Sequence, residues 1–196
     1  ADLTVTDNAD LAATSIALDD TFDFGSLTFN SAGSVVIAEN SATVLSGTST
    51  ANSLDLDSTA SITDDGTADL TVTGNADLAA TSIALDDTFG FGSLTFNSAG
   101  SVSISESGAT ILSGTNTASS LDLDSTAGIT NAASASLTVT NNADVNGTSI
   151  ALGVTTSDVM NFGSLPLNSA GSVVIAEDSA TVLSGTSTAD SLDLDS

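Results

Sequence analysis

The sequence predicts an all-β protein, a parallel β-helix (β-solenoid) that runs as one continuous unit through residues 1–196. Three observations predict it. The chain repeats itself at an offset of 67 residues, its apolar residues alternate with polar ones in short runs, and clusters of Gly, Asn, Asp, Ser and Thr separate these runs. Tandem repetition is typical of stacked architectures in which each unit packs on its neighbours. A β-sandwich of hairpins and a disordered chain are the alternatives.

The repeats occupy residues 1–67, 68–134 and 135–196, and the third copy is truncated. Residues 1–58 align with 68–125 without a gap, and 49 of these 58 positions are identical. In the third copy, four additional residues follow Leu152 and shift the offset to 71. Because the flanking pattern survives this insertion, we expect a surface loop after Leu152.

Each copy contains nine short runs with apolar residues at every second position, such as SLTF, SVVI and SLDL. A period of two indicates β-strands, and the abundant Ser, Thr, Asp and Gly disfavour helices. Nine strands divide into three coils of three strands, or about 22 residues per coil. We expect strands near Leu27, Val35 and Val44 in one coil, near Leu54, Ile62 and Leu70 in the next, and near Leu78, Ile83 and Phe91 in the third, with the cycle restarting at Leu94.

The composition excludes several classes of partner. The chain has 25 acidic residues, no Lys, Arg, His or Cys, and a net charge of -25. Phosphate binding draws mainly on Lys and Arg, so we expect no nucleic acid and no anionic membrane surface as a partner. No apolar stretch is long enough to span a membrane. Without Cys, His or a glycine-rich phosphate loop, we expect no cofactor, calcium being the one exception considered.

The segments GSLTFNSAGSV, LSGTxTAxSLDLDS and DLTVTxNADL recur through essentially the whole chain. In these segments the sequence resembles the very long bacterial cell-surface proteins with β-strand repeats, which are similar to filamentous haemagglutinin-like β-helical adhesins. The resemblance implies a right-handed parallel β-helix that is secreted, attached to the cell surface or assembled into filaments. It implies no catalytic residues.

We therefore expect an extracellular or cell-surface location and a structural role, as a repeat segment of a fibre or giant surface protein without enzymatic activity. Both ends of the chain match the interior of the repeat. The expected partners are further copies of the repeat, joined covalently or end to end. An adhesin module that binds glycans or surfaces, with help from calcium, is the alternative. A polysaccharide-active enzyme with paired carboxylates is a third hypothesis, which the lack of His and Lys disfavours.

The candidate metal ligands come from the recurring SLDLDS segment. They are Asp55 and Asp57, and at corresponding positions Asp122, Asp124, Asp193 and Asp195. If the leucines point inward, the two carboxylates of a pair lie on one outer face, roughly 7 Å apart. Calcium favours carboxylate oxygens but takes six to eight ligands, so a solvated acidic face is the alternative. With three coils per repeat, successive pairs would follow one another at about 14 Å along the axis.

Two further acidic patterns recur. Glu39, Glu106 and Glu177 occupy one position in the three copies, and we interpret them as outward residues in a turn. The LDD segments contribute Asp19 with Asp20 and Asp86 with Asp87, but the third copy has Gly153 and Val154 there, which weakens any site built on them.

Overall fold

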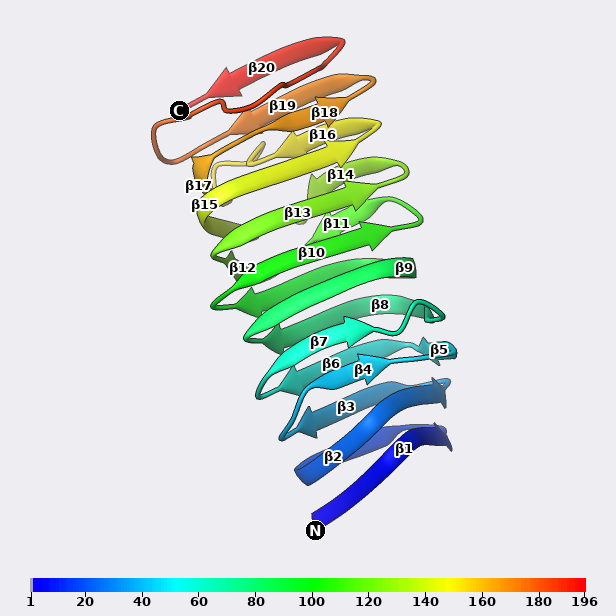
Figure 1. The fold of residues 1–196 in the computed structure, drawn as a ribbon. Coiled ribbons are helices and arrows are strands. Elements are labelled where there is room, and N and C mark those ends of the chain that lie inside the picture. The colour runs from blue at the N-terminus through cyan, green and yellow to red at the C-terminus, as the bar shows by residue number, and fades with distance from the viewer. Residues whose placement is uncertain (1) are drawn as a thin grey trace.

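The computed structural model describes residues 2–196 and shows a parallel β-solenoid (Figure 1). The chain makes about 10 turns of about 19 residues, and its two ends lie at opposite ends of the rod (Figure 1). All strand pairings within the described residues are parallel and join one sheet of 20 strands. The fold class expected from the sequence is confirmed.

The strands alternate with short turns from end to end of the rod. They are β1 (Asp2–Ala13), β2 (Ile16–Ser31), β3 (Ser34–Glu39), β4 (Thr43–Leu45), β5 (Thr48–Ala51), β6 (Ser53–Ser58), β7 (Ser61–Asp64), β8 (Asp69–Ala80), β9 (Ser82–Ser98), β10 (Ser101–Glu106), β11 (Thr110–Leu112), β12 (Thr115–Ala118), β13 (Ser120–Ser125), β14 (Gly128–Asn131), β15 (Ser136–Gly147), β16 (Ser149–Leu152), β17 (Val159–Ser164), β18 (Leu167–Ser169), β19 (Ser172–Ala176) and β20 (Ser191–Asp195).

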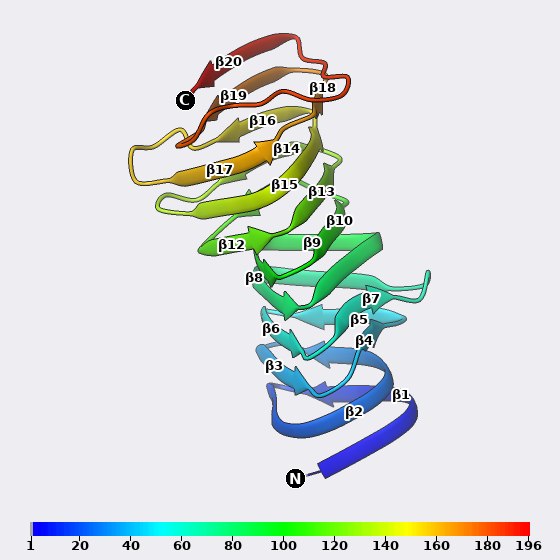
Figure 2. The ribbon, with the colours of Figure 1, turned by 60° about the vertical axis from the view of Figure 1, so that its left-hand side comes forward.

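Corners divide each turn into three sides, and the sides of successive turns stack into three faces of the rod (Figure 2). Face A contains β3 and β6, face B contains β4 and β7, and face C contains β14, β16 and β19. The long strands β2 and β9 bend around corners and contribute to all three faces. On every side the alternate residues point inward, which produces one continuous apolar core.

The 67-residue repeat corresponds to three turns plus one side. On face A, Val35 pairs with Leu54, Leu54 with Ala76 and Ala76 with Leu94, so three turns take 59 residues. Eight more residues reach Val102, the equivalent of Val35 in the second copy, and Val102 lies on face B. The expected coil of about 22 residues is therefore too long. Each copy is turned by one face relative to the copy before it.

The side that the sequence did not reveal is β5, together with its equivalent β12. The inward residues of β5 are Ser49 and Ala51, which are buried although neither is large or apolar. The Ser49 hydroxyl accepts a hydrogen bond from the backbone N–H of Phe29 at 3.1 Å, so the buried oxygen is satisfied. In β12 the buried Asn116 accepts from the N–H of Phe96 at 3.0 Å. With this side included, each repeat has ten sides rather than nine.

Glycine is required where the long strands bend. A Cβ on Gly25 would lie 2.2 Å from the backbone oxygen of Thr6, and a Cβ on Gly92 would lie 2.2 Å from that of Thr73. The pairing register shifts beside each of these glycines, because the neighbouring turn has a bulge there. The four-residue insertion of the third copy lies in the segment 153–158 between β16 and β17, where Val154 is exposed.

Candidate functional site

The predicted metal ligands are exposed and lie on three different faces. Asp55 and Asp57 project from β6 on face A, Asp122 and Asp124 from β13 on face B, and Asp193 and Asp195 from β20 on face C. The expected single row with a spacing of about 14 Å is wrong, because each repeat adds one side to its three turns. Successive pairs point in different directions and do not form a common site.

A third carboxylate joins each of the first two pairs. Asp77 in β8 pairs directly with Asp55 of the preceding turn, and Asp144 in β15 pairs with Asp122. Burial, and then the neighbouring carboxylates, raise the pKa of Asp57, Asp77 and Asp122 above the ordinary value. These three groups therefore hold their charge at a cost, and no basic side chain offsets it.

The three recurring glutamates are buried, which corrects their interpretation as outward turn residues. Glu39, Glu106 and Glu177 are 2%, 2% and 5% exposed. Glu106 Oε1 accepts the backbone N–H of Phe91 at 2.9 Å, and Oε2 accepts the hydroxyl of Thr110 at 2.6 Å. Glu39 makes an equivalent pair of bonds. Burial raises the pKa of Glu106, and the hydrogen bonds from Thr110 and Phe91 partly oppose this. These carboxylates are structural.

The LDD segment of the second copy takes part in an acidic cluster. Carboxylate oxygens of Asp64, Asp86 and Asp87 lie within 4.8 Å of one another, and the backbone N–H of Asp86 donates to Asp64 at 2.9 Å. Oxygen ligands of this kind suit a divalent cation. One repeat later, Asn131 and Gly153 replace Asp64 and Asp86, and the Gly153 N–H donates to Asn131 at 2.9 Å. The cluster is therefore not shared by all copies.

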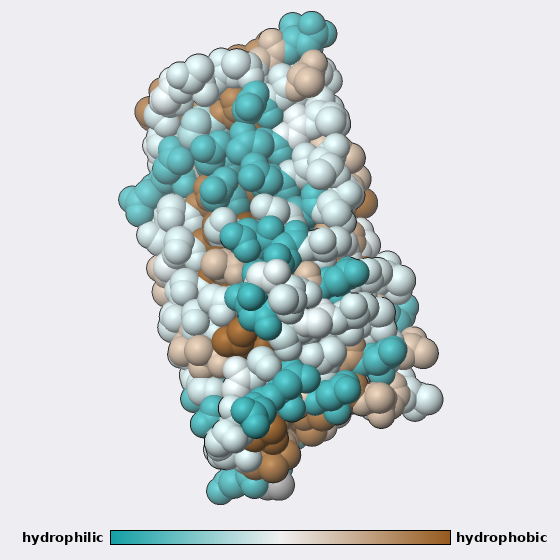
Figure 3. Space-filling view, turned by 45° about the vertical axis from the view of Figure 1, so that its right-hand side comes forward, coloured by the Kyte–Doolittle hydropathy of each residue, from teal (hydrophilic) through white to brown (hydrophobic). Residues whose placement is uncertain are grey.

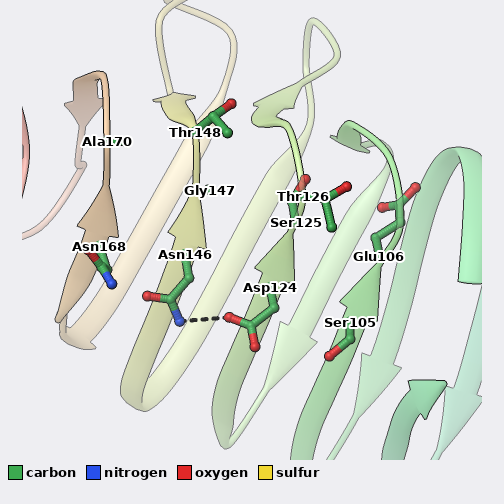
Figure 4. A pocket seen from close by; sticks show the side chains of 10 residues that line it. All are labelled: Ser105, Glu106, Asp124, Ser125, Thr126, Asn146, Gly147, Thr148, Asn168 and Ala170. Carbon is green, nitrogen blue, oxygen red and sulfur yellow. Dashed lines mark hydrogen bonds between the residues drawn. The ribbon is translucent and has the colours of Figure 1, made fainter. Parts of the chain in front are cut away.

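A groove of about 510 Å³ follows the edge between faces B and C (Figure 4). One outward row of its lining crosses four neighbouring turns and consists of Ser105, Asp124, Asn146 and Asn168. The Asn146 amide donates to Asp124 Oδ1 at 2.8 Å (Figure 4). Gly147 and Ala170 supply small positions that leave the groove open.

A second groove of about 430 Å³ repeats the first one at the edge between faces A and B. Its outward row is Ala38, Asp57, Ala79 and Asn97, again across four turns. Every lining residue of the larger groove has its equivalent in the smaller one, 67 or 71 positions earlier in the sequence. We call the pair the repeat grooves, because the repeat unit builds them wherever it lies on the rod.

Free donors and acceptors line the repeat grooves. The Asp57 carboxylate has no hydrogen-bond partner among residues 2–196. The amide oxygen of Asn97 accepts the Thr117 hydroxyl at 2.6 Å, and that of Asn168 accepts the Thr188 hydroxyl, so each amide NH₂ remains available. The grooves therefore offer hydrogen bonds in both directions.

The surface between these features is polar but not uniformly so. Figure 3 shows hydrophilic residues gathered in an upright band on one face, with apolar atoms between them and near the N-terminal end. Residues 2–196 include no helix that could cross a bilayer. Comparison with family models, with curated proteins and with solved structures finds no match for this chain.

Proposed function

We propose that this chain is a structural repeat segment of an extracellular fibre or giant cell-surface protein and acts without catalysis. The observation that carries the proposal is the passage from one copy to the next. Between the first and second copies, β7 and β8 pair with both neighbouring turns, so the core continues without a break. A rod built in this way lengthens by adding copies, and each turn depends on its neighbours to bury its core.

The surface supports this role. A charge of -25 keeps neighbouring rods apart in solution, and the absence of Lys and Arg removes the cleavage sites of trypsin-like proteases. The closest hydroxyl–carboxylate contacts that could suggest a nucleophile, Thr43 with Glu39 and Thr110 with Glu106, are buried away from any substrate. The partners that fit this role are further copies of the repeat, covalent or end to end.

The test is the length of the rod as a function of repeat number. Chains with three, four and five copies should form rods whose length, measured by small-angle scattering and electron microscopy, grows by about 16 Å per copy, because each copy adds three and one third turns of about 4.8 Å. A constant length with growing diameter would contradict the proposal.

An adhesin module is the second candidate, and the repeat grooves favour it. Calcium assistance is tested separately, by the melting temperature with calcium and with chelator. If Asp64, Asp86 and Asp87 bind the ion, calcium raises the melting temperature of the parent and not that of Asp64→Asn/Asp86→Asn. If the SLDLDS pairs bind it, Asp55→Asn/Asp57→Asn loses the response instead. An unchanged melting temperature in the parent would count against both.

A further inference from the structure

We propose that each repeat groove binds an extended, uncharged polysaccharide chain that lies along the rod axis. The first argument is recurrence. The two grooves occur on different edges of the rod and in different copies, yet equivalent residues line them. A hollow that arose from one irregular corner would not return 67 residues later with the same carboxylate and amide.

The polar groups of the grooves match the hydroxyl groups of sugars. The carboxylates of Asp57 and Asp124 accept hydrogen bonds from hydroxyls, and the free NH₂ groups of Asn97 and Asn168 donate to hydroxyl oxygens. Each groove holds one outward carboxylate among several amide and hydroxyl groups, which favours an uncharged ligand over a strongly cationic one.

The dimensions and the neighbouring charge narrow the ligand further. Volumes of about 430 and 510 Å³ fall in the range of small-molecule sites. Each outward row crosses four turns, or about 14 Å, so the ligand lies along the axis and not along a strand. An anionic polymer is excluded because the chain carries 25 acidic residues and no Lys or Arg.

Binding at a single groove is weak. The chain has no Trp and no Tyr, so no such ring stacks on the sugar, and we expect dissociation constants on the order of 1 mM. Because every further copy adds a groove on the next edge, an array would gain strength by binding several chains or several segments at once.

The experiment is an NMR titration of the isotope-labelled chain with four neutral hexasaccharides, built from β-1,4-glucose, α-1,4-glucose, β-1,4-mannose and β-1,4-N-acetylglucosamine. At least one should shift the methyl signals of Ala99 and Ala170, one in each groove, with the same affinity. In Asp57→Asn/Asp124→Asn the affinity should fall by about tenfold, the loss of one charge-assisted hydrogen bond per groove. Ala99→Leu/Ala170→Leu should abolish the shifts by filling both grooves.

The matched control is Asp55→Asn/Asp122→Asn, which removes the same charge from the same strands outside the grooves. It should bind like the parent. Hexalysine serves as the cationic comparison. Absence of shifts with all four sugars, an equal loss in the control, or preferential binding of hexalysine in the grooves would each overturn the inference. None of these outcomes alters the rod-length test, so the inference and the structural proposal can fail independently.

Discussion

Replacing Glu106 tests whether the recurring buried glutamate holds the corner of each turn. Its two carboxylate oxygens accept the backbone N–H of Phe91 and the hydroxyl of Thr110, and Thr110 is itself fully buried. In Glu106→Ala both donors lose their partner. A buried group left without its hydrogen bond costs about 1–3 kcal/mol, so we expect a loss of about 2–6 kcal/mol in the free energy of unfolding.

Glu106→Gln separates the hydrogen bonds from the charge. The amide oxygen can accept from Phe91 and the amide NH₂ can donate to the Thr110 oxygen, so this variant should stay within about 1 kcal/mol of the parent at neutral pH. Burial raises the pKa of Glu106, so its stabilising contribution is present at acidic pH and is lost as the pH rises through this pKa. The Gln variant lacks that dependence, so the parent should gain on it as the pH falls.

The assay is denaturant unfolding followed by far-UV circular dichroism, since the chain has neither Trp nor Tyr for fluorescence. Because a solenoid can open locally, hydrogen exchange at Phe91 and its neighbours accompanies it. The reasoning is refuted if Glu106→Ala costs less than about 1 kcal/mol, or if the Gln and Ala variants lose stability equally.

Three further outcomes follow from the structure. Leu78→Ala, at a site with 0% exposure, should cost about 2–5 kcal/mol in denaturant unfolding, whereas Leu192→Ala, 47% exposed, should stay within about 0.5 kcal/mol; equal losses would contradict the assigned core. The melting temperature should rise from neutral pH to about pH 4.5, because raised pKa values at Asp77 and Asp122 give stability that is lost as the pH rises; a fall would contradict this sign. Gly92→Ala should destabilise β9 strongly, since its Cβ would lie 2.2 Å from a backbone oxygen, and a neutral result by circular dichroism would show that the bend can relax.

The sequence was sufficient for the fold class because period two and tandem repetition survive in nearly every run. It was not sufficient for the turn length. The inward residues of β5 are Ser49 and Ala51, whose side chains are too small or too polar to mark a strand, so one side in ten was overlooked. Omitting one side made each turn seem longer, and this also placed the acidic pairs in a single row.

The candidate sites depended on contacts between turns, which a local pattern does not contain. Period two from Val35 and Ile37 does place Glu39 inward, and that signal was available in the sequence. The pairing of Asp55 with Asp77, 22 residues later, required the true register. The repeat grooves needed the register as well, because each is made by four neighbouring turns.

Deleting one turn distinguishes the two registers directly. Removing residues 35–53 brings Leu54 into the place of Val35 above Ile16, and because Val35 and Leu54 already pair on face A, all later residues keep their inward or outward direction. We expect this shortened chain to retain a cooperative β-sheet transition by circular dichroism. Removing residues 35–56, a turn of about 22 residues as the sequence suggested, places Asp57 above Ile16 and reverses the alternation on that side, burying carboxylates and exposing leucines. That chain should lose its cooperative transition. If the longer deletion folds as well as the shorter one, the register described here is wrong.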